Sequence, residues 1–263
     1  MKLRLVPTPT GVQWVRAGVR TFFRQPLALM GLFLMFLAVV SVLAFVPFIG
    51  SVLALVAVPA LSLGLMAAAR EADEGRFPMP LTLFAALRKS PQASRAMVQL
   101  GLLYAIGVML VMGISALVDG GEFAQVYVQG GGLTPEKVME PGFRSAMWLS
   151  TLLYLPLSLA FWHAPALVHW HDVAPVKSLF FSLVAIFRNR KAYLLYGAMW
   201  LALSLGVGMV AMLLLAFVLR FSGLILAATA MLPLSLVLAA IFFTSQWFTF
   251  RDSFDADSES TIP

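Results

Sequence analysis

Long stretches without any charged residue dominate the chain. A helix that crosses a bilayer needs about 20 apolar residues, and five charge-free runs reach that length, at 25–69, 96–118, 145–171, 192–219 and 221–250. The first run is long enough for two helices, and Pro47-Phe48-Ile49-Gly50 marks a turn inside it. We therefore predict six membrane-spanning helices, at 27–46, 51–69, 97–118, 145–167, 194–219 and 223–249.

The composition supports this prediction and excludes a soluble protein. Hydrophobic residues make up 61% of the 263 residues and charged residues only 11%, whereas a typical soluble domain is roughly 25% charged. The first apolar run is also longer than the roughly 7–15 residues of a signal-peptide core, so we expect a spanning helix there. The predicted fold class is an all-α, polytopic membrane protein.

The basic residues predict the orientation of the chain. Fifteen of the eighteen lysines and arginines lie before the first span, between the second and third, between the fourth and fifth, or after the sixth. Because basic loops remain in the cytoplasm, we expect a multi-pass protein of the bacterial inner membrane with both termini in the cytoplasm. The net charge of +6 therefore indicates anionic lipid headgroups as partners, with other membrane proteins as a further class, and not nucleic acid.

The segment before the first span is predicted to be an amphipathic helix at the membrane surface. Its apolar face consists of Val12, Val15, Val19, Phe22 and Phe23. Its basic face consists of Arg16, Arg20 and Arg24. We expect the apolar face in the lipid boundary, the arginines at the headgroups and Trp14 at the same boundary.

Two later segments share this pattern of an apolar helix followed by basic residues and two spans. One ends in Arg88-Lys89, and the other ends in Arg188, Arg190 and Lys191. One interpretation is a threefold repeat, with units at 10–69, 78–168 and 174–250 of a single domain, 1–250. The alternative is that cytoplasmic loops are commonly basic and amphipathic. The predicted headgroup contacts are Arg16, Arg20, Arg24, Arg88, Lys89, Arg188, Arg190 and Lys191.

Two further segments lie outside the spans. The only sizeable outer loop, about 119–144, contains Gly130-Gly131-Gly132, and we expect it to be only partly helical. Residues 251–263 form a short acidic cytoplasmic tail, for which disorder is the default expectation.

Small residues at intervals of four predict where the spans approach one another closely. Three such stripes occur, at Ala60/Gly64/Ala68, at Gly101/Ala105 and at Ala198/Ala202/Gly206. We predict contacts within one chain, with contacts between identical chains as the alternative.

The sequence offers little chemistry. Without cysteine there are no disulfides and no thiol catalysis. The strongest polar cluster is His163, His169, His171 and Asp172, which could bind a metal if the fold brought the imidazoles together. The alternative is an amphipathic belt at the cytoplasmic interface, and we predict no metal site, no cofactor and no catalytic residue.

The remaining acidic residues near the spans also have a simple interpretation. We take Glu71, Asp73 and Glu74 as a solvated loop after the second span. The spans themselves contain no carboxylate, lysine or arginine, which argues against a proton-coupled pump because such pumps use intramembrane ionisable groups.

Several motifs resemble those of a known family. The chain resembles an uncharacterised family of bacterial six-span inner-membrane proteins. The motifs that carry the resemblance are Gly11, Trp14 and Gly18, then Phe22-Phe23-Arg24-Gln25-Pro26, then 161–167, and then 180–191 leading into Tyr193. This resemblance covers the whole chain and implies no catalytic residue. More loosely, the helix-plus-two-spans unit is similar to membrane domains associated with glycerophosphodiester phosphodiesterases, whose catalytic domain is absent here.

We therefore expect a non-enzymatic membrane interaction or envelope-support component. The alternative is a small-molecule or lipid transporter, similar to a flippase, with a pathway near Pro156, His163 and Pro233. An enzyme is the third interpretation.

Overall fold

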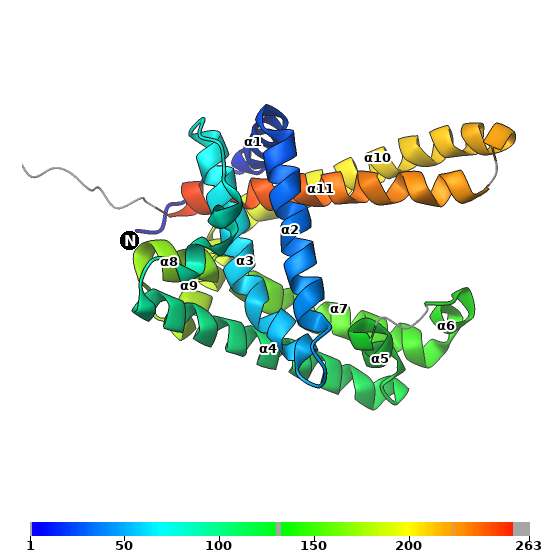
Figure 1. The fold of residues 1–263 in the computed structure, drawn as a ribbon, viewed down its shortest axis with the longest axis horizontal. Coiled ribbons are helices and arrows are strands. Elements are labelled where there is room, and N and C mark those ends of the chain that lie inside the picture. Colours follow the sequence, from blue (N-terminus) through cyan, green and yellow to red (C-terminus); the bar gives the residue numbers. More distant parts are fainter. Residues whose placement is uncertain (1, 130–132, 223, 255–263) are drawn as a thin grey trace, which may run out of the picture. The chain divides into compact units, whose positions relative to one another are not determined.

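The chain is built of helices over the residues that the computed structural model describes, which are 2–129, 133–222 and 224–254, without the side chains of 128, 129, 135 and 214–231. In chain order they are α1 Thr10–Arg24, α2 Pro26–Ala44, α3 Gly50–Asp73, the 3₁₀ helix η1 Pro80–Leu87, α4 Pro91–Asp119, α5 Glu122–Gln129, α6 Pro135–Met139, α7 Pro141–Phe161, α8 Ala164–His171, α9 Pro175–Arg188, α10 Arg190–Ser222 and α11 Leu224–Ser253 (Figure 1).

Six helical stretches in the described part are long and apolar enough to cross a membrane. They are α2, α3, α4, α7 together with α8, α10 and α11. The six predicted spans and the all-α class are thus confirmed. The predicted turn at 47–50 is also present: Phe48 takes a positive φ of 65°, and α3 begins at Gly50.

The fourth span is interrupted, which the prediction of one helix at 145–167 missed. Helix α7 ends at Phe161, and α8 begins at Ala164. Pro165 lies in the first turn of α8, where its missing N–H is tolerated. In an unbroken helix that proline would leave the carbonyl of Phe161 without its donor, so the chain turns before the proline instead.

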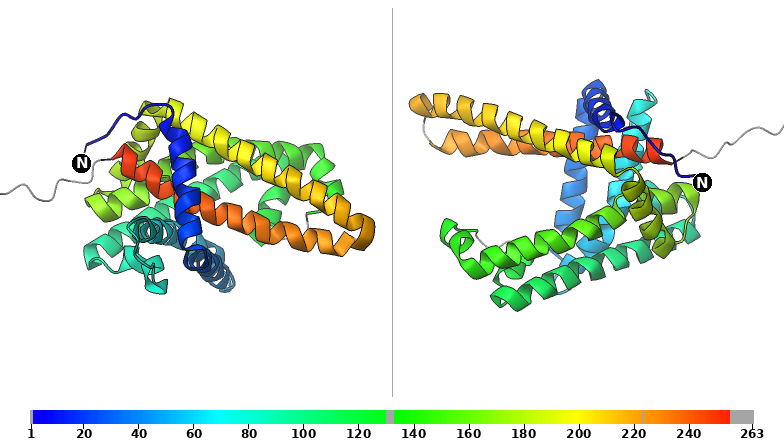
Figure 2. Two further views of the ribbon diagram at one scale, coloured as in Figure 1. Left: turned by 90° about the horizontal axis from the view of Figure 1, so that it is seen from above. Right: turned by 180° about the vertical axis from the view of Figure 1, so that it is seen from behind.

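The described chain forms two compact units, and each is described by itself. The first consists of Met1–Phe36, Gly64–Ala85 and Val184–Pro263. In this unit α10 and α11 run side by side, and α1 lies across both of them (Figures 1 and 2). The crossing is close because glycines replace larger residues: Gly11 lies against the carbonyl of Ala192, and Gly18 lies against Ser245.

The second unit consists of Leu37–Leu63 and Ala86–Leu183. Its α4 and α7 run side by side (Figure 2), and the hydroxyls of Tyr104 and Tyr154 join them at 2.8 Å. Helix α4 begins with Ser90 as its cap, whose Oγ accepts from the N–H of Ala93 at 3.1 Å. It is followed by Gly120 in the left-handed region, the usual conformation after a helix end.

Two of the three small-residue stripes lie at close contacts within the chain, as predicted. Gly64 of α3 lies against the backbone of Leu83, and Gly101 of α4 lies against the carbonyl of Val56. The prediction was wrong for α10, where Ala198 and Ala202 are exposed within their unit and a Cβ on Gly206 would meet open space. Small residues allow a second helix to approach closely, but they do not by themselves cause a second helix to pack there.

The apolar face of α1 also differs from the expectation. Val15 and Phe22 are buried against the protein rather than placed in lipid, whereas Phe23 is 63% exposed. Trp14, expected at the lipid boundary, is buried, and its indole N–H donates to Asp252 Oδ2 at 2.9 Å. The helix is amphipathic as predicted, but α10 and α11 cover most of its apolar face.

The short helices η1 and α9 each contact the second long helix of the preceding predicted repeat unit, and α1, in the first repeat unit, contacts the second long helix of the last one. Helix α1 meets α11 at Gly18 and Ser245, and η1 meets α3 at Leu83 and Gly64. Helix α9 meets the α7–α8 break through Ser182. All three segments are helical, which a threefold repeat requires, and the repeat itself stays a prediction.

The two remaining expectations fall partly outside the described residues. The outer loop contains the short helices α5 and α6, while Gly130-Gly131-Gly132 lies outside the description. Helix α11 extends to Ser253, four residues beyond the predicted end, and 255–263 of the predicted tail also lies outside the description.

Candidate functional site

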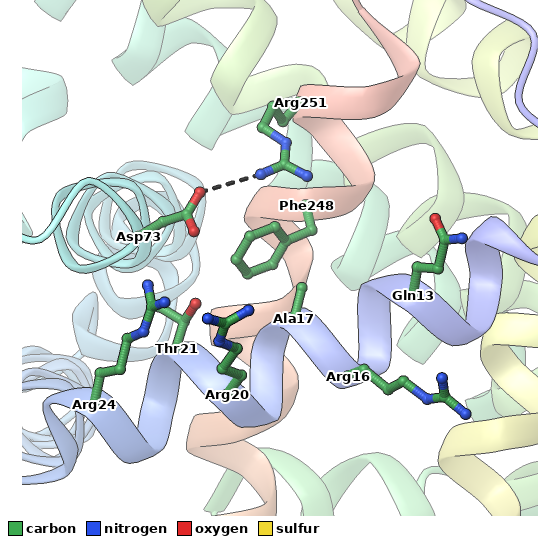
Figure 3. Close-up of a pocket in the computed structure, with 9 residues that line it drawn as sticks. All are labelled: Gln13, Arg16, Ala17, Arg20, Thr21, Arg24, Asp73, Phe248 and Arg251. Carbon is green, nitrogen blue, oxygen red and sulfur yellow. Dashed lines mark hydrogen bonds and ion pairs between the residues drawn. The ribbon is translucent and has the colours of Figure 1, made fainter.

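A hollow beside α1 brings together arginines from two distant parts of the chain. It has a volume of about 340 Å³ and lies within the first unit. Its lining is drawn in Figure 3 and consists of Gln13, Arg16, Ala17, Arg20, Thr21, Arg24, Asp73, Phe248 and Arg251. Four arginines and a single acidic residue therefore line the space, and the guanidinium of Arg16 points away from those of Arg20 and Arg24 (Figure 3).

The α1 arginines share one side of the helix because they are spaced four residues apart, slightly more than one turn. The opposite side is fixed by burial of Trp14, Gly18 and Phe22 against α10 and α11. The arginines are therefore left exposed. The packed face of α1 thus determines the direction in which its basic face points.

The fourth arginine is already neutralised within the protein. Arg251, in the last turn of α11, donates from Nη1 to Asp73 Oδ2 at 3.1 Å and from Nε to Asp252 Oδ1 at 2.8 Å. Its guanidinium also lies 4.9 Å from the ring centre of Phe248. Asp73 is the last residue of α3, so the interpretation of this carboxylate as part of a solvated loop was wrong.

Arg16, Arg20 and Arg24 are different, because none of them forms an ion pair with any residue in the described part of the chain. Guanidinium groups donate hydrogen bonds, do not accept them, and keep their charge at any physiological pH. The hollow can therefore hold an anion through hydrogen bonds that its arginines donate.

The other predicted headgroup residues are not among those that line the hollow. Arg88, Arg188, Arg190 and Lys191 are exposed. Lys89 donates to the carbonyl of His169 and to Asp172 Oδ1, both at 2.7 Å. The structure thus groups three of the eight predicted basic residues in the hollow and leaves their contact with lipid a prediction.

The histidine cluster is divided rather than gathered. His163 is fully buried at the α7–α8 break, where its backbone N–H donates to Ser182 Oγ at 3.1 Å. His169 and His171 are half-buried in the last turn of α8. Asp172 follows in the left-handed region and pairs with Lys89.

A metal site was the sharper interpretation of this cluster. In the ranges that the structure describes, no group of three or more histidine or acidic side chains is arranged to hold a metal ion. The cluster instead contributes to the packing of α8. Lys89, from the segment before α4, forms an ion pair with Asp172 at the end of α8.

Sequence reasoning missed Asp73, Phe248 and Arg251 as members of the hollow. Asp73 and Arg251 are 178 residues apart, and no local pattern links them. Their one shared signal is position: each lies within four residues after the end of a predicted span, where a charged side chain reaches the membrane surface.

Comparison with known proteins gives one extensive match. The chain is 37% identical over 257 residues to a probable inner membrane protein of Burkholderia thailandensis, covering 97% of this chain and 94% of that protein. No family model and no solved structure matches. Together with six apolar helices of spanning length, this similarity shows a multi-pass integral protein of the inner membrane, and the chain belongs to the same family as that inner membrane protein.

Proposed function

We propose that the protein is a non-enzymatic interaction component of the inner membrane, which contacts anionic lipid headgroups through its basic short helices. The observation that carries the proposal is α1, whose three arginines are exposed and free of ion pairs within the described chain. Arg24 is the last residue of α1, and the spanning helix α2 begins at Pro26. The charges therefore lie near the depth of lipid headgroups, where each contributes on the order of 1 kcal/mol to attraction for anionic lipid.

The proposal places both termini in the cytoplasm. The backbone N–H of Arg4 donates to the carbonyl of Ser253 at 2.9 Å, so the first and last described segments lie together. The side chain of Asn189 adds two bonds, to Val6 N–H at 2.9 Å and to the Arg4 carbonyl at 3.0 Å. Both termini then share one side of the membrane, and the excess of basic residues favours the cytoplasmic side.

Single cysteines test the orientation cleanly, because the natural chain contains none. Thr8→Cys reports the N-terminal segment, and Leu133→Cys reports the predicted outer loop; both positions are exposed. In intact spheroplasts a membrane-impermeant maleimide should label Leu133→Cys only, and both variants should react after lysis. Labelling of Thr8→Cys in intact spheroplasts would contradict the proposed orientation.

Lipids that remain with the purified protein test the headgroup contact. The protein extracted from native membranes in a neutral detergent should carry phosphatidylglycerol and cardiolipin above their share of the bulk lipid, as measured by mass spectrometry. A variant with all eight predicted basic residues changed to glutamine should lose this enrichment. Equal lipid composition in the two samples would contradict the proposal, as would protein-dependent movement of a labelled lipid between leaflets, which favours the transporter alternative.

A further inference from the structure

We propose that the hollow beside α1 is a discrete binding site for one phosphodiester group, supplied by the headgroup of an anionic phospholipid. This inference rests on the proposed function and goes beyond it, because general attraction to a charged surface needs no hollow and no fixed number of ligands. Figure 3 shows the space and the side chains that surround it.

The first step is the arrangement of charge. Like charges four residues apart on a helix repel one another, and Arg16, Arg20 and Arg24 repeat this spacing twice. The lining contains one carboxylate, Asp73, which is already paired with Arg251. A bound anion would relieve the remaining repulsion.

The second step is the depth and shape of the site. Thr21 and Phe248 are 2% and 1% exposed, so the hollow has a packed base. Its volume of about 340 Å³ falls within the range of small-ligand sites, roughly 300–1,000 Å³. This is enough for a headgroup fragment rather than a single ion.

The third step is the chemistry of the ligand. Arginine presents two parallel N–H groups that match the geometry of phosphate oxygens, and it is more weakly hydrated than lysine. All four cations that line the hollow are arginines. The exposed Leu27 at the start of α2 lies three residues after Arg24, which places apolar surface for an acyl chain next to the basic face in sequence.

The test counts bound lipids on the full-length protein. In a neutral detergent, native mass spectrometry with short-chain phosphatidylglycerol should show one saturable adduct. The variant R16Q/R20Q/R24Q should bind at least tenfold more weakly. The matched control R88Q/R188Q/R190Q removes three exposed arginines outside the hollow and should change the affinity less than threefold.

A second variant keeps every charge and fills the space. Ala17 lines the hollow, so Ala17→Phe should reduce phosphatidylglycerol binding at least tenfold while its thermal unfolding stays close to that of the natural protein. Binding equal to the natural protein would overturn the site. If Ala17→Phe does not fold, the arginine variants test the site instead. Their side chains are exposed and can be changed without disturbing the packed face of α1.

Three outcomes separate this inference from the general proposal. Equal weakening in both triple variants would overturn the discrete site and leave general headgroup contact standing. No phosphatidylglycerol adduct, together with no enrichment in native membranes, would overturn both. Saturable binding of inorganic phosphate without lipid binding would overturn the assignment to a lipid headgroup.

Discussion

Two short basic helices, α1 and α9, meet the long helices in opposite ways. Helix α1 contacts α11 through a glycine, Gly18 against Ser245, and leaves its arginines facing an open hollow. Helix α9 contacts the α7–α8 break through a polar side chain: Ser182 Oγ donates to the carbonyl of Leu159 at 2.8 Å and accepts from the N–H of His163. One contact uses backbone proximity, and the other uses hydrogen bonds.

The difference shows how polar groups serve two purposes in the same kind of element. At α9 the polar groups that meet the long helix are satisfied inside the protein, so they contribute to stability. At α1 the arginines have no ion-pair partner in the described chain, so they remain able to bind something else. Changes at α1 arginines should therefore affect binding, whereas changes at the α9 contact should affect stability.

The largest expected effect comes from filling the glycine contact of α1. Gly18→Leu forces a side chain into Ser245 of α11, and overpacking typically costs about 1–3 kcal/mol, with the upper end expected here because the Ser245 backbone must also move. The thermal unfolding midpoint in detergent should fall strongly, and phosphatidylglycerol binding should fall with it. Gly197→Leu is the matched control, because a Cβ there meets open space and leucine favours helix over glycine. Equal behaviour of the two variants would contradict the role of the contact.

Removing the hydroxyl at the α9 contact should have the next largest effect. Ser182→Ala leaves the buried His163 N–H without its partner, which costs about 1–3 kcal/mol, while the Leu159 carbonyl keeps the 3.4 Å bond from the N–H of Trp162. Ser158→Ala is the control, because that hydroxyl bonds only to the carbonyl of Leu155 in its own helix. The thermal unfolding midpoint of Ser182→Ala should fall below that of Ser158→Ala, and phosphatidylglycerol binding should be unchanged in both variants. Loss of phosphatidylglycerol binding in Ser182→Ala would contradict the proposal that the α9 contact affects stability and the α1 arginines affect binding.

A smaller effect is expected at the N-terminal segment that leads into α1. Asn189→Ala removes the two bonds that hold Arg4 and Val6, so trypsin should cleave after Arg4 several times faster, as followed by mass spectrometry. Gln13→Ala, an exposed change on α1 itself, should leave the cleavage rate unchanged. An unaltered rate in Asn189→Ala would show that the bond from the Arg4 N–H to the Ser253 carbonyl and the packing of α1 hold the segment without Asn189.

The smallest effect is expected for the ion pair that closes the end of α8. Lys89→Gln breaks its contacts with Asp172 and with the carbonyl of His169. Exposed pairs of this kind contribute about 0–1 kcal/mol, so the unfolding midpoint should change little, with Arg188→Gln as the neutral reference. A loss comparable to that of Ser182→Ala would mean that the ion pair stabilises this region as much as the α9 contact does.

The spans could be predicted because each is a long charge-free run, and soluble helices, which need a polar face, rarely contain such runs. The break before Ala164 could not be predicted, because Pro165 is equally consistent with a kink inside a continuous helix. The exposed stripe on α10 shows the same limit, since Ala198 and Ala202 allow a close contact without requiring one.

The arginine hollow was only half predictable. The spacing of Arg16, Arg20 and Arg24 is visible in the sequence and gives a basic helix face. The contributions of Asp73 and Arg251 depend on how α3 and α11 end beside α1, and that is tertiary packing. The sequence therefore predicts which charges are presented to the lipid surface, but not the concave shape that they line.

The contact between α1 and α11 also sets an order of events during synthesis. Gly18 of α1 is made well before Ser245, the residue of α11 against which it packs. At roughly 5–20 residues per second, α1 remains without its partner for on the order of ten to forty-five seconds after it leaves the ribosome. During that time α10 alone is available to cover part of the apolar face of α1. The apolar face of α1 is therefore covered in full only after α11 has been made.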